Sequence, residues 1–434
     1  MGGISPVTGG ADAPLLPKSK LSAKHASVSG AVFNVSTSII GAGIMSIPAT
    51  TKVLGVVPAF LLIVAVAWLA DISVEFLLRF THAGDSTTYG GLMKESFGQV
   101  GSVLVQICVI VTTLGCLIVF LIIIGDVLTG NQHGESIHLG VLQEWFGIHW
   151  WCSRPFALLF IVVFVLFPLV LFRRVESLRF TSAVSVFLAV VFVGISSVMA
   201  IAALIEGKAK NPKLLPDDKT SVFDLFTAVP VIVTAFTFHF NVHPIGFEME
   251  KPSDMTTAVK ISLVLCAAIY FAIGVFGYLL FGEEVMSDIL VNFDHISSPM
   301  GSLLNDVVRL SYAFHIMLVF PLLNFSLRSN IDEFIFPHKP LLAKDNTRFL
   351  SLTLFLLAVC YLAAIAIPNI WYFFQFVGST TVVSLAFIFP AAIVLRDVHG
   401  ISTTRDRVVA ATMLVLAVVT STIAISTNIY NYVV

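Results

Sequence analysis

The feature that most constrains this chain is an apolar segment, long enough to cross a bilayer, that carries a break at its own centre. Residues 31–53 are largely apolar, yet Gly41, Ala42 and Gly43 lie near the middle and Pro48 follows shortly after. Glycine and proline are poor residues for a helix interior. Backbone groups freed in lipid are costly, so such a break is expected to face protein or a wet cavity that can bind a small polar solute. The segment therefore predicts a solute site rather than a membrane anchor.

Composition extends the membrane interpretation to the whole chain. Charged residues make up 12% of the sequence, against about 25% in soluble domains, and hydrophobic residues make up 57%. A net charge of −2 leaves no basic surface for a nucleic acid, which is therefore not expected as a partner. The apolar composition makes the lipid bilayer the expected partner. A hydropathy window predicts an all-α integral membrane protein of about eleven spans. These spans are 31–53, 57–81, 101–129, 154–172, 177–205, 223–247, 257–281, 304–327, 346–367, 370–394 and 408–429.

The ends and loops predict how the chain is oriented. Residues 1–28 form a polar tail without an apolar core, which is not expected of a cleavable signal peptide. Lys and Arg are concentrated in the loops on the side of this tail, which predicts a cytoplasmic N-terminus. The run Asp12-Ala13-Pro14-Leu15-Leu16 loosely resembles an acidic dileucine sorting signal. It favours the vacuole or another internal membrane, with the plasma membrane as the alternative.

A second segment shares the character of the first. Residues 223–247 contain Pro230, His239, His243 and Pro244 within an apolar span. The two interrupted segments are spans one and six, as a five-plus-five inverted repeat requires. Residues 29–434 are therefore expected to form one transmembrane domain. It would comprise a first repeat over 31–205, a second over 223–394 and an extra helix over 408–429.

Three stretches carry a specific resemblance. They are the run FNVSTSIIGAGIMSIP from Phe33, the run FHFNVHPIGFEME from Phe238, and the segment from Arg309 to Ser329. Together they resemble the amino acid/auxin permease family, in particular its plant vacuolar-type amino acid transporters, which are related to the animal sodium-coupled neutral amino acid transporters. The likeness extends over nearly the whole chain. It implies a leucine-transporter-like bundle that acts as a secondary transporter of amino acids.

The resemblance and the break together imply a binding model. Amides of Gly41, Ala42 and Gly43, at the start of a half-helix, can bind a substrate carboxylate. The alternative function of these small residues is close helix packing. The resemblance places the substrate ammonium against backbone carbonyls of both broken segments and completes the pocket from span eight. The residues it implies are Ser38, Ile40, Phe236, Thr237, Phe238, Tyr312 and His315.

The expected coupling ion follows from two positions at which this sequence differs from the sodium-coupled relatives. Those relatives ligate sodium with an Asn on span one and a Thr on span eight, where this chain has Thr37 and either Met317 or Val319. A thioether or an alkyl group is a poor ligand for a hard cation. The sequence therefore favours a proton, which histidine can carry in the physiological range, with sodium symport as the alternative.

Four residues are candidates for the coupling ion. Ionisable groups within spans are expensive and usually functional, which selects His315 first and then His239; neutral hydrogen bonding at a helix contact is the alternative for each. Thr37 is the candidate hydroxyl ligand. Asp71 shares a helical stripe with Glu75 and Arg79, where structural pairing is the favoured interpretation and proton carriage the alternative.

Other functional classes find less support. His239 and His243 share a helical face but lack a third ligand, so no metal site is predicted. No nucleophile and base occur in a recognisable motif, so the chain is not expected to be an enzyme and no cofactor is predicted. An amino-acid sensor of the same fold and a carrier of auxin-like weak acids remain alternatives.

Overall fold

The computed structural model describes residues 26–133, 136–218, 220–249, 251–293, 299–367 and 376–433. Most of the described chain is helical, and a short antiparallel hairpin joins β1 (Asn131–His133) to β2 (Ser136–His138). Most of the predicted polar tail, residues 1–25, lies outside the described residues, as does part of the tenth predicted span, residues 370–375. The fold is thus all-α, as the composition predicts.

Among the described residues, nine helices are long and apolar enough to cross a membrane, or ten if the bent pair α1 and α2 counts as one span. A shorter apolar helix, Arg154–Val170, occupies the fourth predicted span. Each of the eleven predicted segments therefore overlaps a helical segment, and their division into two repeats stays a prediction. The helices are α1 (Val28–Ile39), α2 (Ile47–Leu54), α3 (Val56–Ala83), α4 (Tyr89–Thr129), α5 (Val141–Phe146), α6 (Arg154–Ile161), α7 (Phe167–Val170), α8 (Arg179–Ile205), α9 (Val222–Ala235), α10 (His239–Phe247), α11 (Pro252–Phe281), α12 (Ile289–Phe293), α13 (Pro299–Ile335), α14 (Asn346–Ala366), α16 (Phe389–Arg396) and α17 (Thr404–Val433).

The first break lies where the glycines predict it. Ser27 caps α1 by accepting a hydrogen bond from the Gly30 amide, and α1 ends at Ile39. Gly41 is extended, with φ −131° and ψ −153°, and is followed by a 3₁₀ turn over Ala42–Ser46. Pro48 then lies in the first turn of α2, where its missing N–H costs no hydrogen bond. The two parts of the span meet at a bend of 49°.

The second break lies at Phe236–Phe238, between α9 and α10. The two prolines that drew attention to this span do not form the break, because Pro230 lies inside α9 and Pro244 inside α10. At the break itself, the Thr237 hydroxyl donates to the Val233 carbonyl at 2.6 Å, a local bond of the kind that competes with continued helix.

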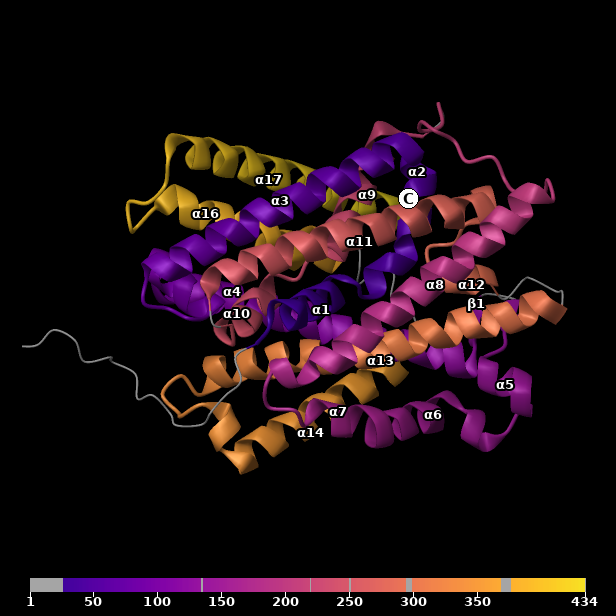
Figure 1. The fold of residues 1–434 in the computed structure, drawn as a ribbon, viewed down its shortest axis with the longest axis horizontal. Helices are drawn as coiled ribbons and strands as arrows, with labels where there is room; N and C mark the ends of the chain where they lie inside the picture. The colour runs from indigo at the N-terminus through magenta and orange to yellow at the C-terminus, as the bar shows by residue number, and fades with distance from the viewer. Residues whose placement is uncertain are drawn as a thin grey trace, which may run out of the picture.

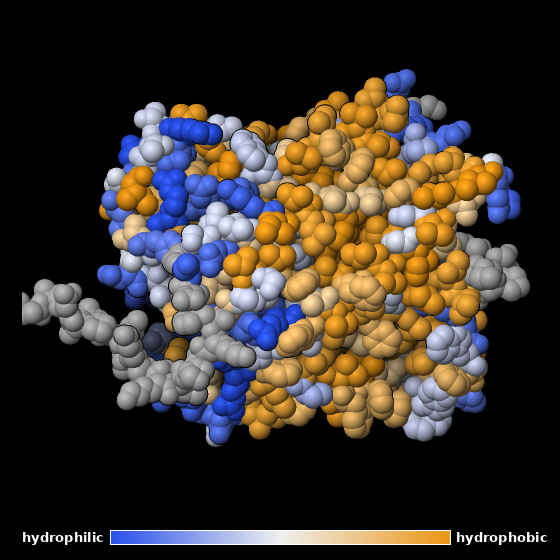
Figure 2. Space-filling view, in the orientation of Figure 1, coloured by the Kyte–Doolittle hydropathy of each residue, from blue (hydrophilic) through white to orange (hydrophobic). Residues whose placement is uncertain are grey.

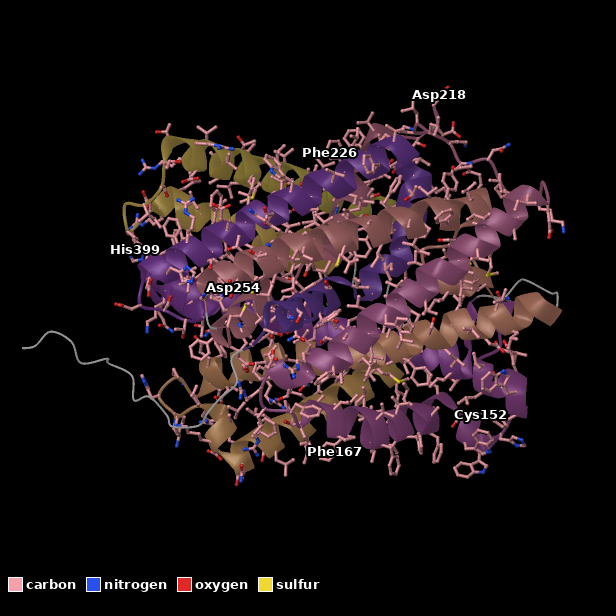
Figure 3. The ribbon with its side chains drawn as sticks, viewed as in Figure 1. Cys152, Phe167, Asp218, Phe226, Asp254 and His399 are labelled. Carbon is pink, nitrogen blue, oxygen red and sulfur yellow. The ribbon has the colours of Figure 1, made fainter. Side chains whose placement is uncertain are left out.

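The helices form a bundle with the broken segments inside it (Figure 1). Helix α1 packs between α11 and α8, α13 packs against α8 and α4, and α17 packs against α9 and α16. The visible face is largely hydrophobic over its centre and more hydrophilic towards the two ends (Figure 2). His399 and Asp254 lie towards one end, here termed the His399 end, and Asp218 and Cys152 lie towards the other, here termed the Asp218 end (Figure 3). This distribution is that of a multi-pass membrane protein.

Candidate functional site

The first break turns three successive backbone carbonyls towards side chains of other helices. These carbonyls, of Ile39, Ile40 and Gly41, follow the last turn of α1, where a helix leaves its acceptors without internal partners. Side chains of α11 and α13 satisfy them, so the break is held in place rather than exposed to lipid. The donors are Tyr270 Oη to Ile39 at 2.7 Å, His315 Nε2 to Ile40 at 3.0 Å and Tyr312 Oη to Gly41 at 2.9 Å.

Tyr270 connects the two breaks. Its hydroxyl oxygen lies 2.7 Å from the Ile39 carbonyl oxygen and 2.9 Å from that of Ala235, the last residues of α1 and α9. A phenol has one hydrogen to donate, so it can satisfy only one of these carbonyls at a time. The C-terminal end of a helix is the negative pole of its dipole, and two such ends converge here. The arrangement suits a cationic group.

Sequence reasoning located this region only in part. The Ile39 carbonyl lies between Ser38 and Ile40, two residues that the resemblance implies, and the Ala235 carbonyl precedes the implied Phe236 by one residue. Tyr270 was not predicted. The available signal was a tyrosine in an apolar span, because a buried phenol needs a hydrogen-bond acceptor.

The glycines of the first break have different surroundings. A Cβ on Gly43 would lie 2.8 Å from the Ala235 Cα, so the two broken segments pack closely at this residue. A Cβ on Gly41 would lie 3.3 Å from the Phe120 ring. Ala42 begins the 3₁₀ turn, whose first amides lack partners within the turn. Close packing against Ala235 therefore accounts for a glycine at position 43.

Ser38 takes part in a buried chain of polar groups. Its hydroxyl donates to the Asn34 carbonyl at 2.8 Å and accepts from Asn241 Nδ2 at 2.8 Å. The Ser326 hydroxyl in turn donates to Asn241 Oδ1. The chain joins α1, α10 and α13, and Asn241 and Ser326 are contributors that the sequence did not single out.

The side chains of the second break form mainly an apolar wall. Phe236 and Phe238 are buried, and the Phe236 ring meets that of Tyr270 edge to face at 5.1 Å between centroids. The Thr237 hydroxyl is engaged with Val233 within its own helix. These three residues, which the resemblance implies for the pocket, lie at the break, and their polar contribution is their backbone.

His315 lies between two backbone carbonyls. Its Nδ1 is 2.7 Å from the Ser185 oxygen and its Nε2 is 3.0 Å from the Ile40 oxygen. Carbonyls only accept, so a neutral imidazole can donate to one of them, whereas an imidazolium can donate to both. The Ser185 hydroxyl, 2.9 Å from Nδ1 and 3.3 Å from the His315 carbonyl, can donate to either. The site therefore has a consistent hydrogen-bond pattern for each charge state of His315.

Thr37 lies on the same seam between α1 and α8. Its hydroxyl donates to the Ser182 carbonyl at 3.0 Å. Thr37 lies one turn before Ile40, the residue that follows α1, and Ser182 and Ser185 are one turn apart on α8. The structure thus brings Thr37 and His315, two of the four coupling-ion candidates, close to one another.

His239 is placed differently. It is fully buried at the start of α10, beside the rings of Phe238 and Phe387 at centroid distances of 5.3 and 6.5 Å. Neither ring nitrogen has a hydrogen-bond partner in the part of the chain that the structure describes. Within that part, no group of three His, Cys, Asp or Glu side chains could hold a metal.

Asp71 has no described link to the break. It is partly buried on α3, and the positive charge of Lys260 on α11 acts on its carboxylate. Within the predicted stripe, Arg79 lies 3.9 Å from Glu75 but forms its shorter ion pair, of 2.9 Å, with Asp406 of α17. The stripe thus contributes to packing between α3 and α17.

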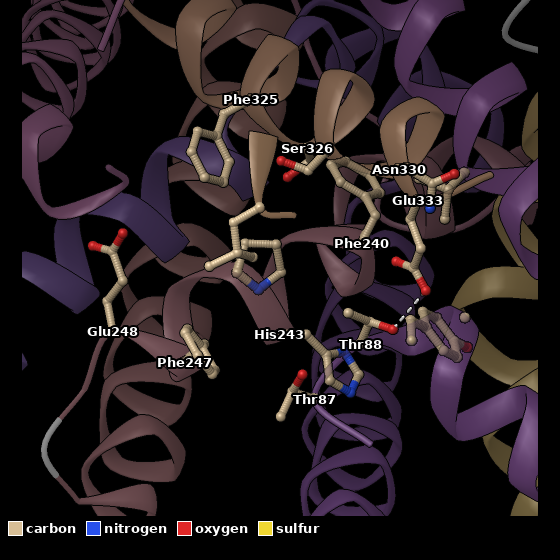
Figure 4. A pocket seen from close by; sticks show the side chains of 16 residues that line it. Thr87, Thr88, Phe240, His243, Phe247, Glu248, Phe325, Ser326, Asn330 and Glu333 are labelled. Atoms are coloured by element: carbon tan, nitrogen blue, oxygen red, sulfur yellow. Dashed lines mark hydrogen bonds between the residues drawn. The ribbon is translucent and has the colours of Figure 1, made fainter. Parts of the chain in front are cut away.

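A cavity of about 250 Å³, here termed the vestibule, is seen from close by in Figure 4. It lies towards the His399 end, where Figure 1 places α10. It is lined mainly by residues from 87–90, 240–248 and 325–333, and it includes Ser326 of the buried polar chain.

At the opposite end of the molecule, the Lys213 carbonyl accepts from the Val56 amide at 3.0 Å. A Cβ on Gly55 would lie 2.6 Å from the Leu215 carbonyl carbon, and the φ of Gly55 is +77°. The loop that contains Lys213 and Leu215 is therefore tightly packed against the C-terminal end of α2.

Comparison with known proteins places this geometry in a family. The family model described as transmembrane amino acid transporter protein matches residues 24–433. The chain is similar to amino acid transporter AVT6C of Arabidopsis thaliana, with 66% identity over 96% of this chain and 97% of the relative. It is also similar to amino acid transporter AVT6D of the same plant, with 61% identity over 97% of each.

Solved structures show the same fold. The structure of MhsT in complex with L-phenylalanine matches with a TM-score of 0.60 and 12% identity, over 93% of this chain and 99% of that one. The structure of a manganese transporter from Eremococcus coleocola matches with a TM-score of 0.59 and 15% identity, over 93% and 87%. The bundle is thus of the leucine-transporter type that the sequence predicts.

Proposed function

The chain belongs to the transmembrane amino acid transporter protein family, and we propose that it carries amino acids across a membrane by alternating access, coupled to protons. It is a multi-pass membrane protein and not an enzyme. The relatives named above as amino acid transporters support the substrate class. Substrate binds between the two breaks.

One observation carries the substrate assignment. The C-terminal ends of α1 and α9 converge on the Tyr270 hydroxyl, and the 3₁₀ turn at Ala42 presents the start of a half-helix beside them. A free amino acid carries a cation and an anion on one carbon. Its ammonium replaces Tyr270 as donor to the carbonyls of Ile39 and Ala235, and its carboxylate binds the amides around Ala42.

His315 supplies the proton coupling. In its charged form it donates to both the Ile40 and Ser185 carbonyls, which ties the break of α1 to α8. In its neutral form it gives up one of these bonds, and the Ser185 hydroxyl takes its place. The protonation state therefore biases the position of α1 against α8, and a group that interacts differently with two conformations shifts their populations.

The proton gradient sets the direction of transport, and the orientation sets which end of the protein faces the cytosol. With a cytoplasmic N-terminus, the His399 end and its vestibule face the cytosol. Each pH unit across the membrane is worth about 1.4 kcal/mol per proton. In the membrane of an acidic vacuole, proton symport then moves amino acids from the lumen to the cytosol.

Sodium coupling is the second candidate, because one observation favours it. The α1–α8 seam holds the Thr37 hydroxyl and the Ser182 carbonyl, and the side-chain oxygens of Ser36 and Ser182 are buried without described partners. Hard oxygen ligands suit sodium. The buried Met317 and Val319 of α13 offer it no ligand.

Counterflow of a labelled amino-acid mixture into proteoliposomes preloaded with unlabelled amino acids tests the substrate class. The wild type is expected to exchange label, and Gly43→Leu is expected to abolish exchange because the new side chain collides with Ala235. Gly194→Leu is the matched control, since nothing lies within 4 Å of the Cβ position there. Size-exclusion profiles establish that the variants fold. Wild-type protein that binds amino acids without exchanging them would contradict transport and favour a sensor.

A further inference from the structure

We infer that the vestibule contains a second amino-acid site, in which His243, Asn330 and Glu333 hold the substrate ammonium between the breaks and the His399 end. The inference rests on the proposed function, because it takes the ligand to be the transported amino acid. Three acceptors in one cavity complement the three N–H donors of a primary ammonium.

The tautomer of His243 follows from its neighbour. The Thr81 hydroxyl donates its one hydrogen to the Leu77 carbonyl at 2.8 Å. His243 Nε2, 2.9 Å from the same Thr81 oxygen, must then be the donor in that contact. The ring is thus protonated on Nε2, and Nδ1 is left as an acceptor.

His243 Nδ1 therefore carries a lone pair for which no hydrogen-bond donor is described. The residue is 6% exposed, its Nδ1 has no hydrogen bond within the described part of the chain, and it lines the vestibule. Tyr89 stacks on the ring at 5.7 Å between centroids and fixes its orientation. A buried acceptor left unpaired is costly, which indicates a group that a ligand completes.

Glu333 supplies the negative charge. Its carboxylate accepts from the Thr88 hydroxyl at 2.9 Å, and Figure 4 shows the two side chains meeting at the cavity wall. None of the ion pairs found among the described residues includes Glu333. A carboxylate has room for several donors, so one hydroxyl leaves most of its capacity free.

Asn330 completes the set from the same helix. It lies one turn before Glu333 on α13, so the two side chains share a face. Its Oδ1 is buried without a described partner, and the residue lines the vestibule. Ser326, a further turn back, connects this face to Asn241 and so to the first break.

The charge of the cavity selects a cation. Among the described residues that line it are two carboxylates, of Glu248 and Glu333, and neither lysine nor arginine. The oxygens of Glu248 already accept from the amides of Val175 and Glu176, at 3.0 and 2.7 Å. Glu333 is therefore the carboxylate available to a ligand. The volume of about 250 Å³ is below the roughly 300–1,000 Å³ of sites for drug-sized molecules and suits a smaller solute.

A carboxylate-free amine separates this site from the one at the breaks. n-Propylamine, protonated at neutral pH, can bind the vestibule acceptors, whereas at the breaks it can bind only the carbonyls of Ile39 and Ala235 and leaves the amides around Ala42 unfilled. Variants of the vestibule residues therefore assign its inhibition to one site or the other. It is expected to inhibit amino-acid counterflow by the wild type, whereas propionate at the same concentration is not. Glu333→Gln and His243→Asn are each expected to raise the inhibitory concentration by about tenfold or more, the scale of a lost hydrogen bond to a charged group.

Glu95→Gln is the matched control. Glu95 lies on the same helix as the vestibule wall but contacts Asp85 and His399 outside the cavity. Its substitution should leave counterflow and inhibition unchanged. Wild-type counterflow that is insensitive to n-propylamine, or equal sensitivity in Glu333→Gln, would overturn the inference.

Failure of the proposed function gives a different result. If the wild type exchanges no amino acid, binding of labelled n-propylamine to the purified protein replaces counterflow as the measurement. Saturable binding that is weakened in Glu333→Gln and unchanged in Glu95→Gln supports the site on its own. Binding that is absent, or equal in all three proteins, contradicts it.

Discussion

His315 on α13 and Ile40 at the break of α1 are joined by a contact of 3.0 Å between the ring Nε2 and the backbone carbonyl oxygen. The contact places a titratable side chain against the first residue after α1, where the chain leaves helical geometry. On its other side, the same ring meets the Ser185 carbonyl of α8 at 2.7 Å. A change of charge at His315 therefore acts on both α1 and α8.

Replacing His315 by Gln tests the coupling. Glutamine can donate one hydrogen bond to Ile40 but cannot carry a proton. Uptake against a gradient should lose its dependence on an imposed pH difference, while counterflow persists. The accumulation ratio should fall by about tenfold for each unit of pH difference, since one unit corresponds to about 1.4 kcal/mol.

Ser185→Ala is the companion variant. It removes the hydroxyl that satisfies Nδ1 of neutral His315 and keeps the backbone carbonyl that accepts from the charged form. The variant should favour the charged state and shift the pH profile of transport upwards. A profile that is the same as in the wild type would show that the hydroxyl has no part in the switch.

Tyr270→Phe should lower stability. The variant removes the donor to the carbonyls of Ile39 and Ala235 and leaves one buried acceptor more without a partner, at a cost of about 1–3 kcal/mol. Thermal unfolding in detergent measures the loss. Tyr361→Phe is the control, because Tyr361 makes a single, more exposed bond to the Pro155 carbonyl. Equal losses in the two variants would contradict a special role for Tyr270.

Gly43→Ala should impair both transport and stability, because its Cβ would lie 2.8 Å from the Ala235 Cα and 2.9 Å from the Ala235 Cβ. Overpacking of this kind costs about 1–3 kcal/mol. Adding Ala235→Gly removes the second clash but not the first, so the double variant should recover only part of the loss in thermal unfolding. Full recovery would show that the strain comes only from the contact with the Ala235 methyl group, and not from the contact with the Ala235 Cα.

Thr37→Val distinguishes the two coupling ions. The hydroxyl holds α1 to α8 through the Ser182 carbonyl, so its loss should cost about 1 kcal/mol of stability and leave transport pH-driven. Initial rates measured against sodium concentration and against pH provide the comparison. A sodium dependence that Thr37→Val weakens would favour the sodium alternative.

The features that could be predicted from the sequence are those that depend on the residue types within a single segment. Gly41 and Gly43 mark the first break because glycine is a poor residue for a helix interior, and His315 was selected because ionisable groups are rare within spans. Pro230 and Pro244 predicted the second broken segment but not the position of its break, since both lie inside helices.

The remaining parts depend on contacts between distant segments. The contact of Tyr270 with Ile39 spans 231 positions of sequence, and no periodicity along α11 reveals it. The vestibule likewise needs α4, α10 and α13 together, and the Nδ1 acceptor of His243 depends on Thr81 of a fourth helix. Such relations follow from the tertiary arrangement, which the pattern of spans alone does not specify.

The most direct test of the central claim is uptake of labelled amino acids into proteoliposomes under an imposed pH gradient, with an imposed sodium gradient measured in parallel. The account predicts accumulation driven by the pH gradient in the absence of sodium, and its loss in His315→Gln. Accumulation that requires sodium and proceeds without a pH gradient would contradict it.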